Sequence, residues 1–569
     1  MTGGLWESQE VFRGAEGPAS RAVLSWALAL VALVPSMMLL GGSLRPKTCW
    51  LRSMVHAVAR PCWAAPLVAA LVALLISGAL AARHPPTAYI HDEFTYLMQA
   101  DTFAHGRVSN PVPPEWRHFE TFHILLQPTY SAKYPPGQAL TLALGQILFD
   151  APIAGVWLAF AAACAAVAWA ARAWLGPRWG LVAGLLAALH PSIHMFKPFT
   201  WTQSYWGGGL AFLGGALLMG AWRRLDRHVA VSSGLAFGAG LSILLLTRPW
   251  EGVVATLPIA AGLLARQFDG SHALKPFFLR FALPVAALLL LTAAGVARVN
   301  KAVTGSATTM PYMEYEKQYA AAPIFIFQEA PPARWNEHPG ITSYHGGWSR
   351  GIYEKQRSLK GFLAVFAFKC FLLFNFYPGA YLGLIPGFFM LLRSHRFGRI
   401  SLVVVFGLIA TFCTCWTQPH YVAPAAGAFF LFATACARRL ACCLKNRRAA
   451  LWMAATGLLS SPVLLMFGGL ILPSRSRPAW ADERVRIIQE LEARPGNHLV
   501  FVKYGPLHNI NFEWVYNSAD LTSQRIIWAR TRDEEKDARL VQAFPGREVW
   551  EIEPDRGVPQ MKRVEGEGK

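Results

Sequence analysis

Two adjacent carboxylates, Asp92 and Glu93, follow His91 a few residues beyond an apolar segment, in the run YIHDEFTY at residues 89–96. Ionisable side chains beside a membrane segment are costly and usually mark a functional site. A carboxylate within hydrogen-bonding distance of a hydroxyl group can act as its general base. The alternative is that Asp92 is the N-cap of a helix over residues 94–106, because aspartate is a favoured N-cap. These residues alone leave both readings open.

A second group of polar residues lies at the ends of other apolar segments. Arginine, lysine and histidine can bind a phosphate group through charge-assisted hydrogen bonds. The alternative for each is anchoring at the membrane interface, which accounts for most arginines at helix ends. We expect Arg248 to contact a phosphate. The further candidates for substrate binding in this group are Lys197, Glu251, His420 and Tyr421.

The segment that begins at His91 continues into a longer pattern. Residues 100–107 read ADTFAHGR, residues 133–137 read KYPPG, and an apolar stretch follows at 138–150. That stretch is too short to cross a bilayer and favours a helix at the membrane interface. The ordered set resembles the first extracytoplasmic loop of the GT-C membrane glycosyltransferases. Within that superfamily it is most similar to the bacterial branch related to protein O-mannosyltransferases and lipid A aminoarabinose transferase.

The resemblance covers roughly residues 60–470 and carries implications for fold and site. It implies a catalytic first loop, two interfacial helices and a lipid-linked sugar donor. It also implies that Asp92 is the catalytic carboxylate and Glu93 its supporting partner. The same loop supplies further expected substrate-binding residues: His91, Tyr96, Lys133 and Tyr134. The segment QPHYVAP at 418–424 resembles a His-Tyr-x-x-Pro turn of the same branch.

The composition identifies the class of protein that must position these residues. Of 569 residues, 54% are hydrophobic and only 15% are charged, whereas soluble proteins carry about 25% charged residues. The sequence therefore predicts an α-helical polytopic membrane protein. The net charge of +20 would fit a nucleic-acid-binding protein, but the basic residues gather in short loops between apolar segments. We interpret them as a topology signal and exclude nucleic acid as a partner.

Apolar segments and basic loops together predict the topology. The candidate spans are 21–44, 62–82, 152–174, 179–194, 204–222, 229–247, 250–265, 277–298, 374–392, 400–417, 424–438 and 449–472. We expect about 11–12 transmembrane helices with a GT-C-like arrangement, although the segment at 21–44 precedes the span that the family places first. Basic residues follow the first, fifth, ninth and eleventh segments, which places those loops in the cytoplasm. The predicted location is the bacterial cytoplasmic membrane, with the catalytic loops facing the periplasm or exterior.

The same map predicts three regions. They are an N-terminal region at 1–61, a transmembrane catalytic region at 62–472 with outer loops at 83–151 and 299–373, and an extracytoplasmic α/β domain at 473–569. In the last region we expect strands at 498–502, 525–528 and 548–552 and a helix at 533–544. Its default role is structural or acceptor docking. Paired prolines at 331–332 and paired glycines at 346–347 predict irregular structure in the second outer loop.

The expected function is transfer of a monosaccharide from a polyprenyl-phosphate donor to an extracytoplasmic lipid, glycan or protein. We expect Asp92 to act as the general base and the anomeric carbon of the sugar to be inverted. Membrane lipids are expected to surround the helical bundle. This chemistry requires no cofactor, and the sequence leaves open a divalent ion at Asp92, Glu93 or a histidine. One alternative is a polytopic transporter or lipid-carrier flippase, which would place ionisable residues near the membrane midplane. The other alternative is a non-catalytic scaffold whose C-terminal domain binds a partner.

Overall fold

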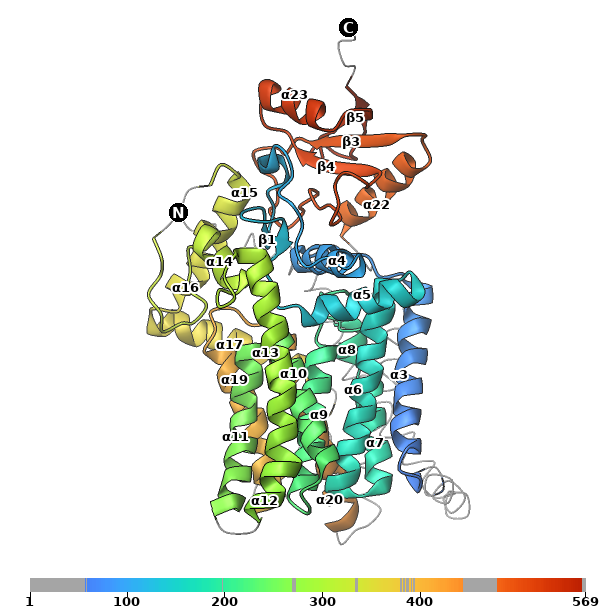
Figure 1. Cartoon of the computed structure of the whole chain (residues 1–569), viewed down its shortest axis with the longest axis vertical. Helices are drawn as coiled ribbons and strands as arrows, with labels where there is room; N and C mark the ends of the chain where they lie inside the picture. The colour runs from blue at the N-terminus through green and yellow to red at the C-terminus, as the bar shows by residue number, and fades with distance from the viewer. Residues whose placement is uncertain are drawn as a thin grey trace.

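The computed structural model describes residues 57, 59–196, 198–268, 273–332, 336–378, 381, 384, 388–389, 391, 394–443 and 478–564. A bundle of apolar helices carries a layer of loops and short helices at one end, and a small α/β unit lies beyond that layer (Figure 1). The predicted spans at 21–44 and 449–472, much of 374–392 and Lys197 lie outside the described residues.

The bundle is built from long apolar helices that pack through small side chains. Its helices are α3 (Ala64–Arg83), α6 (Pro152–Leu175), α7 (Pro177–Ala188), α9 (Gly209–Leu225), α10 (Val231–Thr247), α11 (Pro249–Phe268), α13 (Leu283–Thr304), α19 (His395–Phe412) and α20 (Ala423–Cys443). Helix α6 is central and packs against α3, α7 and α9. Its buried face is rich in alanine, which lets helix backbones approach closely in a membrane.

Five helical stretches among the described residues are long and apolar enough to cross a membrane. They are Ala64–Arg83, Pro152–Leu175, Leu274–Thr304, Leu359–Phe376 and Pro419–Leu440. Together with the shorter apolar helices they make this a multi-pass membrane protein. One of the five corrects the predicted map, because most of α17 (Leu359–Phe376) lies within the expected outer loop at 299–373. The buried Lys369 interrupts the apolar pattern of this helix, and its ammonium group donates to the carbonyl oxygen of Thr414 at 2.6 Å.

The first outer loop folds into two helices that lie across the end of the bundle (Figure 1). They are α4 (His91–Ala104) and α5 (Gly137–Phe149), which agree closely with the helices predicted at 94–106 and 138–150. A 3₁₀ turn, η2 (Trp116–Phe119), and a two-stranded hairpin, β1 (Ile124–Leu125) with β2 (Ser131–Ala132), lie between them. Helix α5 contacts α6 closely because residue 155 is glycine, and a Cβ there would overlap the carbonyl oxygen of Thr141.

The second outer loop is more helical than its sequence predicts. Its elements are α14 (Pro311–Tyr319), α15 (Pro339–Thr342), the π-helix η4 (Ser343–Ser349) and α16 (Arg350–Lys355). The paired glycines 346–347 lie inside η4, so the expectation of irregular structure is wrong at that point. Ile341, just before η4, is buried in a small core with Phe122 and Tyr315, which joins this part of the second loop to the first loop.

The C-terminal region forms the α/β unit that the strand pattern predicts. Its elements are α22 (Ala479–Glu492), β3 (Asn497–Val502), β4 (Ile526–Arg530), α23 (Glu534–Ala543), β5 (Arg547–Ile552) and β6 (Lys562–Arg563). The strand order is β4-β3-β5-β6, with β3 parallel to both β4 and β5. Its apolar core is continuous with Phe94, Met98 and Phe119 of the first loop, so the two regions fold against one another.

Candidate active site

The first turn of α4 is capped by Glu93. Ile90 is the N-cap residue, with extended backbone angles, and the side chain of Glu93 reaches back to it. Oε2 of Glu93 accepts the backbone N–H groups of Tyr89 and Ile90, each at 3.1 Å. This arrangement satisfies the free N–H groups that precede a helix. Asp92 is therefore not the N-cap, and its carboxylate is available for other contacts.

Asp92 lies where three segments of the first loop meet. Its Oδ1 atom accepts a hydrogen bond from the hydroxyl group of Tyr134, and its Oδ2 atom lies 3.9 Å from Nε2 of His123. Tyr134 belongs to the KYPPG segment before α5, and its ring stacks on Tyr96 of α4 at a centroid distance of 4.7 Å. The side chain of Asp92 is 19% exposed. It is thus held in place on one side and still reachable from outside.

Glu93 faces the protein interior rather than the same opening. Its side chain is fully buried, and Oε1 accepts the backbone N–H of Tyr205 at 2.9 Å. Burial raises the pKa of Glu93 to about 7, and the three backbone hydrogen bonds oppose that rise. Glu93 therefore fixes α4 against the segment before α9, and its part in the reaction stays a prediction.

Lys133 joins the first loop to the second. Its ammonium group lies 3.2 Å from Oε1 of Glu316. It also lies over the rings of Tyr312 and Tyr315, at 4.6 Å and 4.3 Å from their centroids. Cation–π contacts of this kind stabilise a desolvated cation. The second outer loop thus closes one side of the space around Asp92 with aromatic rings.

The described phosphate-binding candidates lie at the end of the bundle that carries α4. The guanidinium group of Arg248, between α10 and α11, lies 4.4 Å from the ring centroid of Tyr421. Burial raises the pKa of Tyr96, and the charges of Arg248 and Asp92 also act on it in opposite directions. Arg248 and Asp92 thus both act electrostatically on Tyr96.

Two further candidates of this group, Glu251 and His420, are buried. Glu251 lies in the first turn of α11 and is 6% exposed. His420 lies in η6 (Pro419–Val422), and its ring packs against Trp206 at a centroid distance of 4.9 Å. Glu251 thus places a carboxylate one turn from Arg248.

His91 is a packing residue in this structure. Its ring stacks on Phe122 with a centroid distance of 4.1 Å and an interplanar angle of 4°. Burial lowers the pKa of His91 to about 4, so the ring is neutral at ordinary pH. Across the described part of the chain, no three His, Cys, Asp or Glu side chains lie close enough together to hold a metal ion.

Sequence reasoning missed several residues of the site. His123, Tyr315, Glu316 and Tyr344 surround Asp92 or Lys133, and three of them come from the second outer loop. A local signal existed only for the run PYMEYE at 311–316, where aromatic and acidic residues alternate. The sequence around His123 gave no such signal.

Three residues of the ADTFAHGR segment lie apart from Asp92. Asp101, His105 and Arg107 line a cavity of about 330 Å³ together with residues of the C-terminal unit. Asp101 accepts the backbone N–H of Ala519 at 2.9 Å. This part of the family-like pattern joins the first loop to the C-terminal unit.

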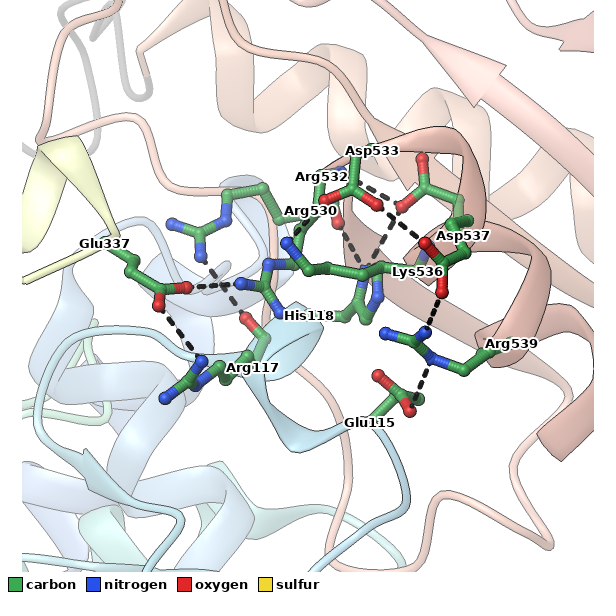
Figure 2. Close-up of polar contacts among 11 residues, drawn as sticks. Glu115, Arg117, His118, Glu337, Arg530, Arg532, Asp533, Lys536, Asp537 and Arg539 are labelled. Carbon is green, nitrogen blue, oxygen red and sulfur yellow. Dashed lines mark hydrogen bonds and ion pairs between the residues drawn. The ribbon is translucent and has the colours of Figure 1, made fainter.

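Figure 2 shows a second junction between the same regions. Glu337 of the second loop bridges Arg117 of the first loop, at 3.0 Å, and Arg532 of the C-terminal unit. His118 is buried in η2, and its Nδ1 lies 2.8 Å from the carbonyl oxygen of Arg530. Three regions that are distant in sequence thus meet in one polar network.

Comparison with known proteins identifies solved structures with a similar fold. No family model and no curated protein matches the sequence. Among solved structures, ArnT from Cupriavidus metallidurans bound to undecaprenyl phosphate is similar over 86% of this chain and 92% of its own, with a TM-score of 0.50 and 14% identity. The oligosaccharyltransferase of Archaeoglobus fulgidus in complex with zinc and sulfate is similar over 76% of this chain, with a TM-score of 0.45 and 14% identity. This chain spans about 60% of the length of that protein. The likeness to ArnT shows the GT-C fold, as the sequence pattern predicts.

Proposed function

We propose that this protein transfers a monosaccharide from a polyprenyl-phosphate sugar to an acceptor hydroxyl outside the cytoplasm, on a lipid, a glycan or a protein. The observation that carries the proposal is a partly exposed carboxylate, Asp92, held by Tyr134 at the end of a GT-C bundle where the guanidinium group of Arg248 also lies, over the ring of Tyr421. A structure of ArnT with this fold holds undecaprenyl phosphate. A lipid-linked donor for this chain is consistent with that likeness.

The proposed reaction is a single displacement. Asp92 accepts the proton of the acceptor hydroxyl as that oxygen forms a bond to the anomeric carbon of the sugar. The bond from the anomeric carbon to the phosphate oxygen breaks, and polyprenyl phosphate leaves with the electron pair. Arg248 stabilises the negative charge that grows on the phosphate. Attack opposite the leaving group inverts the anomeric carbon.

Tyr134 and Lys133 have supporting parts in this scheme. The hydroxyl group of Tyr134 holds one oxygen of Asp92, which leaves the second oxygen to receive the proton. Lys133 and its aromatic neighbours close the site on the side of the second loop, which excludes water from a sugar that would otherwise be hydrolysed.

The location of the charges argues against the transporter alternative. A secondary transporter places its ionisable residues near the membrane midplane, at breaks in its helices. Asp92, Arg248 and Glu251 instead gather where the bundle meets the outer loops. A site at the outer end fits transfer to an acceptor on that side of the membrane. We place the protein in the bacterial cytoplasmic membrane with this end facing the periplasm or exterior.

The test uses purified protein in lipid nanodiscs. Radiolabelled polyprenyl-phosphate sugars of several kinds are supplied with a cell-envelope extract as the source of acceptors, beside the same sugars as nucleotide donors. We expect transfer of label from at least one lipid-linked donor and none from the nucleotide sugars. Transfer from a nucleotide sugar in the absence of polyprenyl phosphate, or no transfer from any donor, would contradict the proposal.

A further inference from the structure

His123 has an unusual backbone conformation close to Asp92. Its φ angle is +64°, in the left-handed region that a residue with a Cβ rarely adopts. Such a conformation is strained, and it is retained where the surroundings enforce it, commonly at functional sites. The side chain of His123 is 4% exposed, so the strained residue is enclosed by the protein.

Both outer loops hold the backbone of His123 in this conformation. Its N–H donates to the hydroxyl oxygen of Tyr315 at 3.0 Å, and its carbonyl oxygen accepts the N–H of Lys133 at 3.1 Å. The preceding residue, Phe122, stacks on His91, the neighbour of Asp92 in α4. The position of the imidazole is therefore set from several directions.

The imidazole is directed at the proposed base. Nε2 of His123 lies 3.9 Å from Oδ2 of Asp92, while the hydroxyl group of Tyr134 binds Oδ1. Catalytic hydrogen bonds are often long without substrate and shorten in the complex. Nδ1 of His123 is buried and has no hydrogen-bond partner. Nε2 faces Asp92, so it is the ring nitrogen that can donate a hydrogen bond to the carboxylate.

The charge state of His123 suits this position. Burial lowers its pKa well below the ordinary value, and the nearby Lys133, His91 and His345 lower it further. A protonated imidazole would stabilise the ionised form of Asp92 and make it a weaker base. A neutral ring that presents Nε2–H can orient the carboxylate with a smaller loss of basicity, because it adds no positive charge.

We propose that His123 is a positioning residue for Asp92. Its imidazole binds one lone pair of Oδ2 and Tyr134 binds Oδ1, so that the carboxylate is oriented before the acceptor arrives and the second lone pair of Oδ2 remains free for the proton. The strained backbone places the ring there. This inference rests on the proposed glycosyl transfer and adds a residue that contacts the base.

The test replaces the ring and relieves the strain at the same time. His123→Gly relieves the positive φ but leaves a cavity where the buried ring packed, so the variant is expected to fold with a moderately lower melting temperature. We expect kcat to fall by about 10- to 100-fold, as for other partners that orient a catalytic group, with little change in the donor KM. Millimolar imidazole added at mildly alkaline pH should restore part of kcat. Asp150→Gly is the matched control, because Asp150 also has a positive φ, +51°, at the exposed end of α5.

The outcomes separate this inference from the proposed function. A wild-type protein that transfers sugar while His123→Gly retains full kcat overturns the positioning role. A variant that loses kcat without rescue by imidazole shows that the ring only packs, and overturns it as well. A wild type that transfers nothing from any donor refutes the proposed function instead.

Discussion

Replacing Asp92 by asparagine separates a base from a merely structural carboxylate. The amide oxygen of the introduced asparagine can still accept the hydroxyl group of Tyr134, and the start of α4 depends on Ile90 and Glu93. The loss in stability is therefore expected to be about 1 kcal/mol, the size of one weakened hydrogen bond. Removal of a general base, in contrast, typically slows a reaction by about 10²–10⁴-fold, which is roughly 3–5 kcal/mol of barrier. The two effects differ enough to be measured independently.

The assay compares turnover of Asp92→Asn and wild type with saturating donor, at matched expression and melting temperature. Asp101→Asn is the control, because Asp101 lies on the same helix but bonds to Ala519 and Gln146 instead. It should keep wild-type kcat within about twofold, since it contacts no reacting group in the scheme. Near-normal turnover by Asp92→Asn would refute the base assignment. A large loss in Glu93→Gln alone would transfer the assignment to Glu93.

Three further predictions follow from the structure. The pKa of Glu93 is raised from 4.5 to about 7, so its contribution to stability is complete below 4.5 and is lost as pH rises through 7. The wild-type unfolding free energy should fall over this range by up to about 3 kcal/mol more than that of Glu93→Gln in chemical denaturation, and equal slopes would contradict the raised pKa. Glu337→Lys should weaken docking of the C-terminal unit, because it places a cation against Arg117 and Arg532. Limited proteolysis should then release that unit sooner, and an unchanged rate would show that the bridge contributes nothing. For topology, cysteine introduced at Ser109 should react with an impermeant maleimide and cysteine at Ser53 should not, whereas the reverse pattern would invert the orientation.

The sequence was most informative where the pattern is local. The spacing from Asp92 to Tyr134 places both residues in one loop, and the structure brings them into contact. The helices of that loop and the strands of the C-terminal unit were also predictable, because apolar periodicity and flanking turn residues report directly on local structure. The GT-C fold was implied by the resemblance of these ordered motifs to the first loop of that superfamily.

The parts that could not be predicted depend on contacts between distant segments. The pairing of Lys133 with Glu316 joins residues 183 positions apart, and nothing in either segment indicates the other. The helix at Leu359–Phe376 was missed because Lys369 reads as a loop residue until its partner, the carbonyl oxygen of Thr414, is known. The left-handed backbone of His123 is held by hydrogen bonds to Tyr315 and Lys133, and nothing in the sequence around His123 indicates these contacts.

The docking of the C-terminal unit argues for a structural role in the reaction. In α/β folds with parallel strands, ligands usually bind at the carboxyl edge of the sheet. Here that edge is occupied by the chain itself, since His118 lies against Arg530 at the end of β4. His338 of the second loop lies 3.5 Å from Glu513, in the connection that follows β3. The first loop runs from His118 to Phe122 and His123. Phe122 stacks on His91, and His123 lies 3.9 Å from Asp92. The sheet edge that would hold a ligand in other proteins therefore holds the loop on which the proposed base depends.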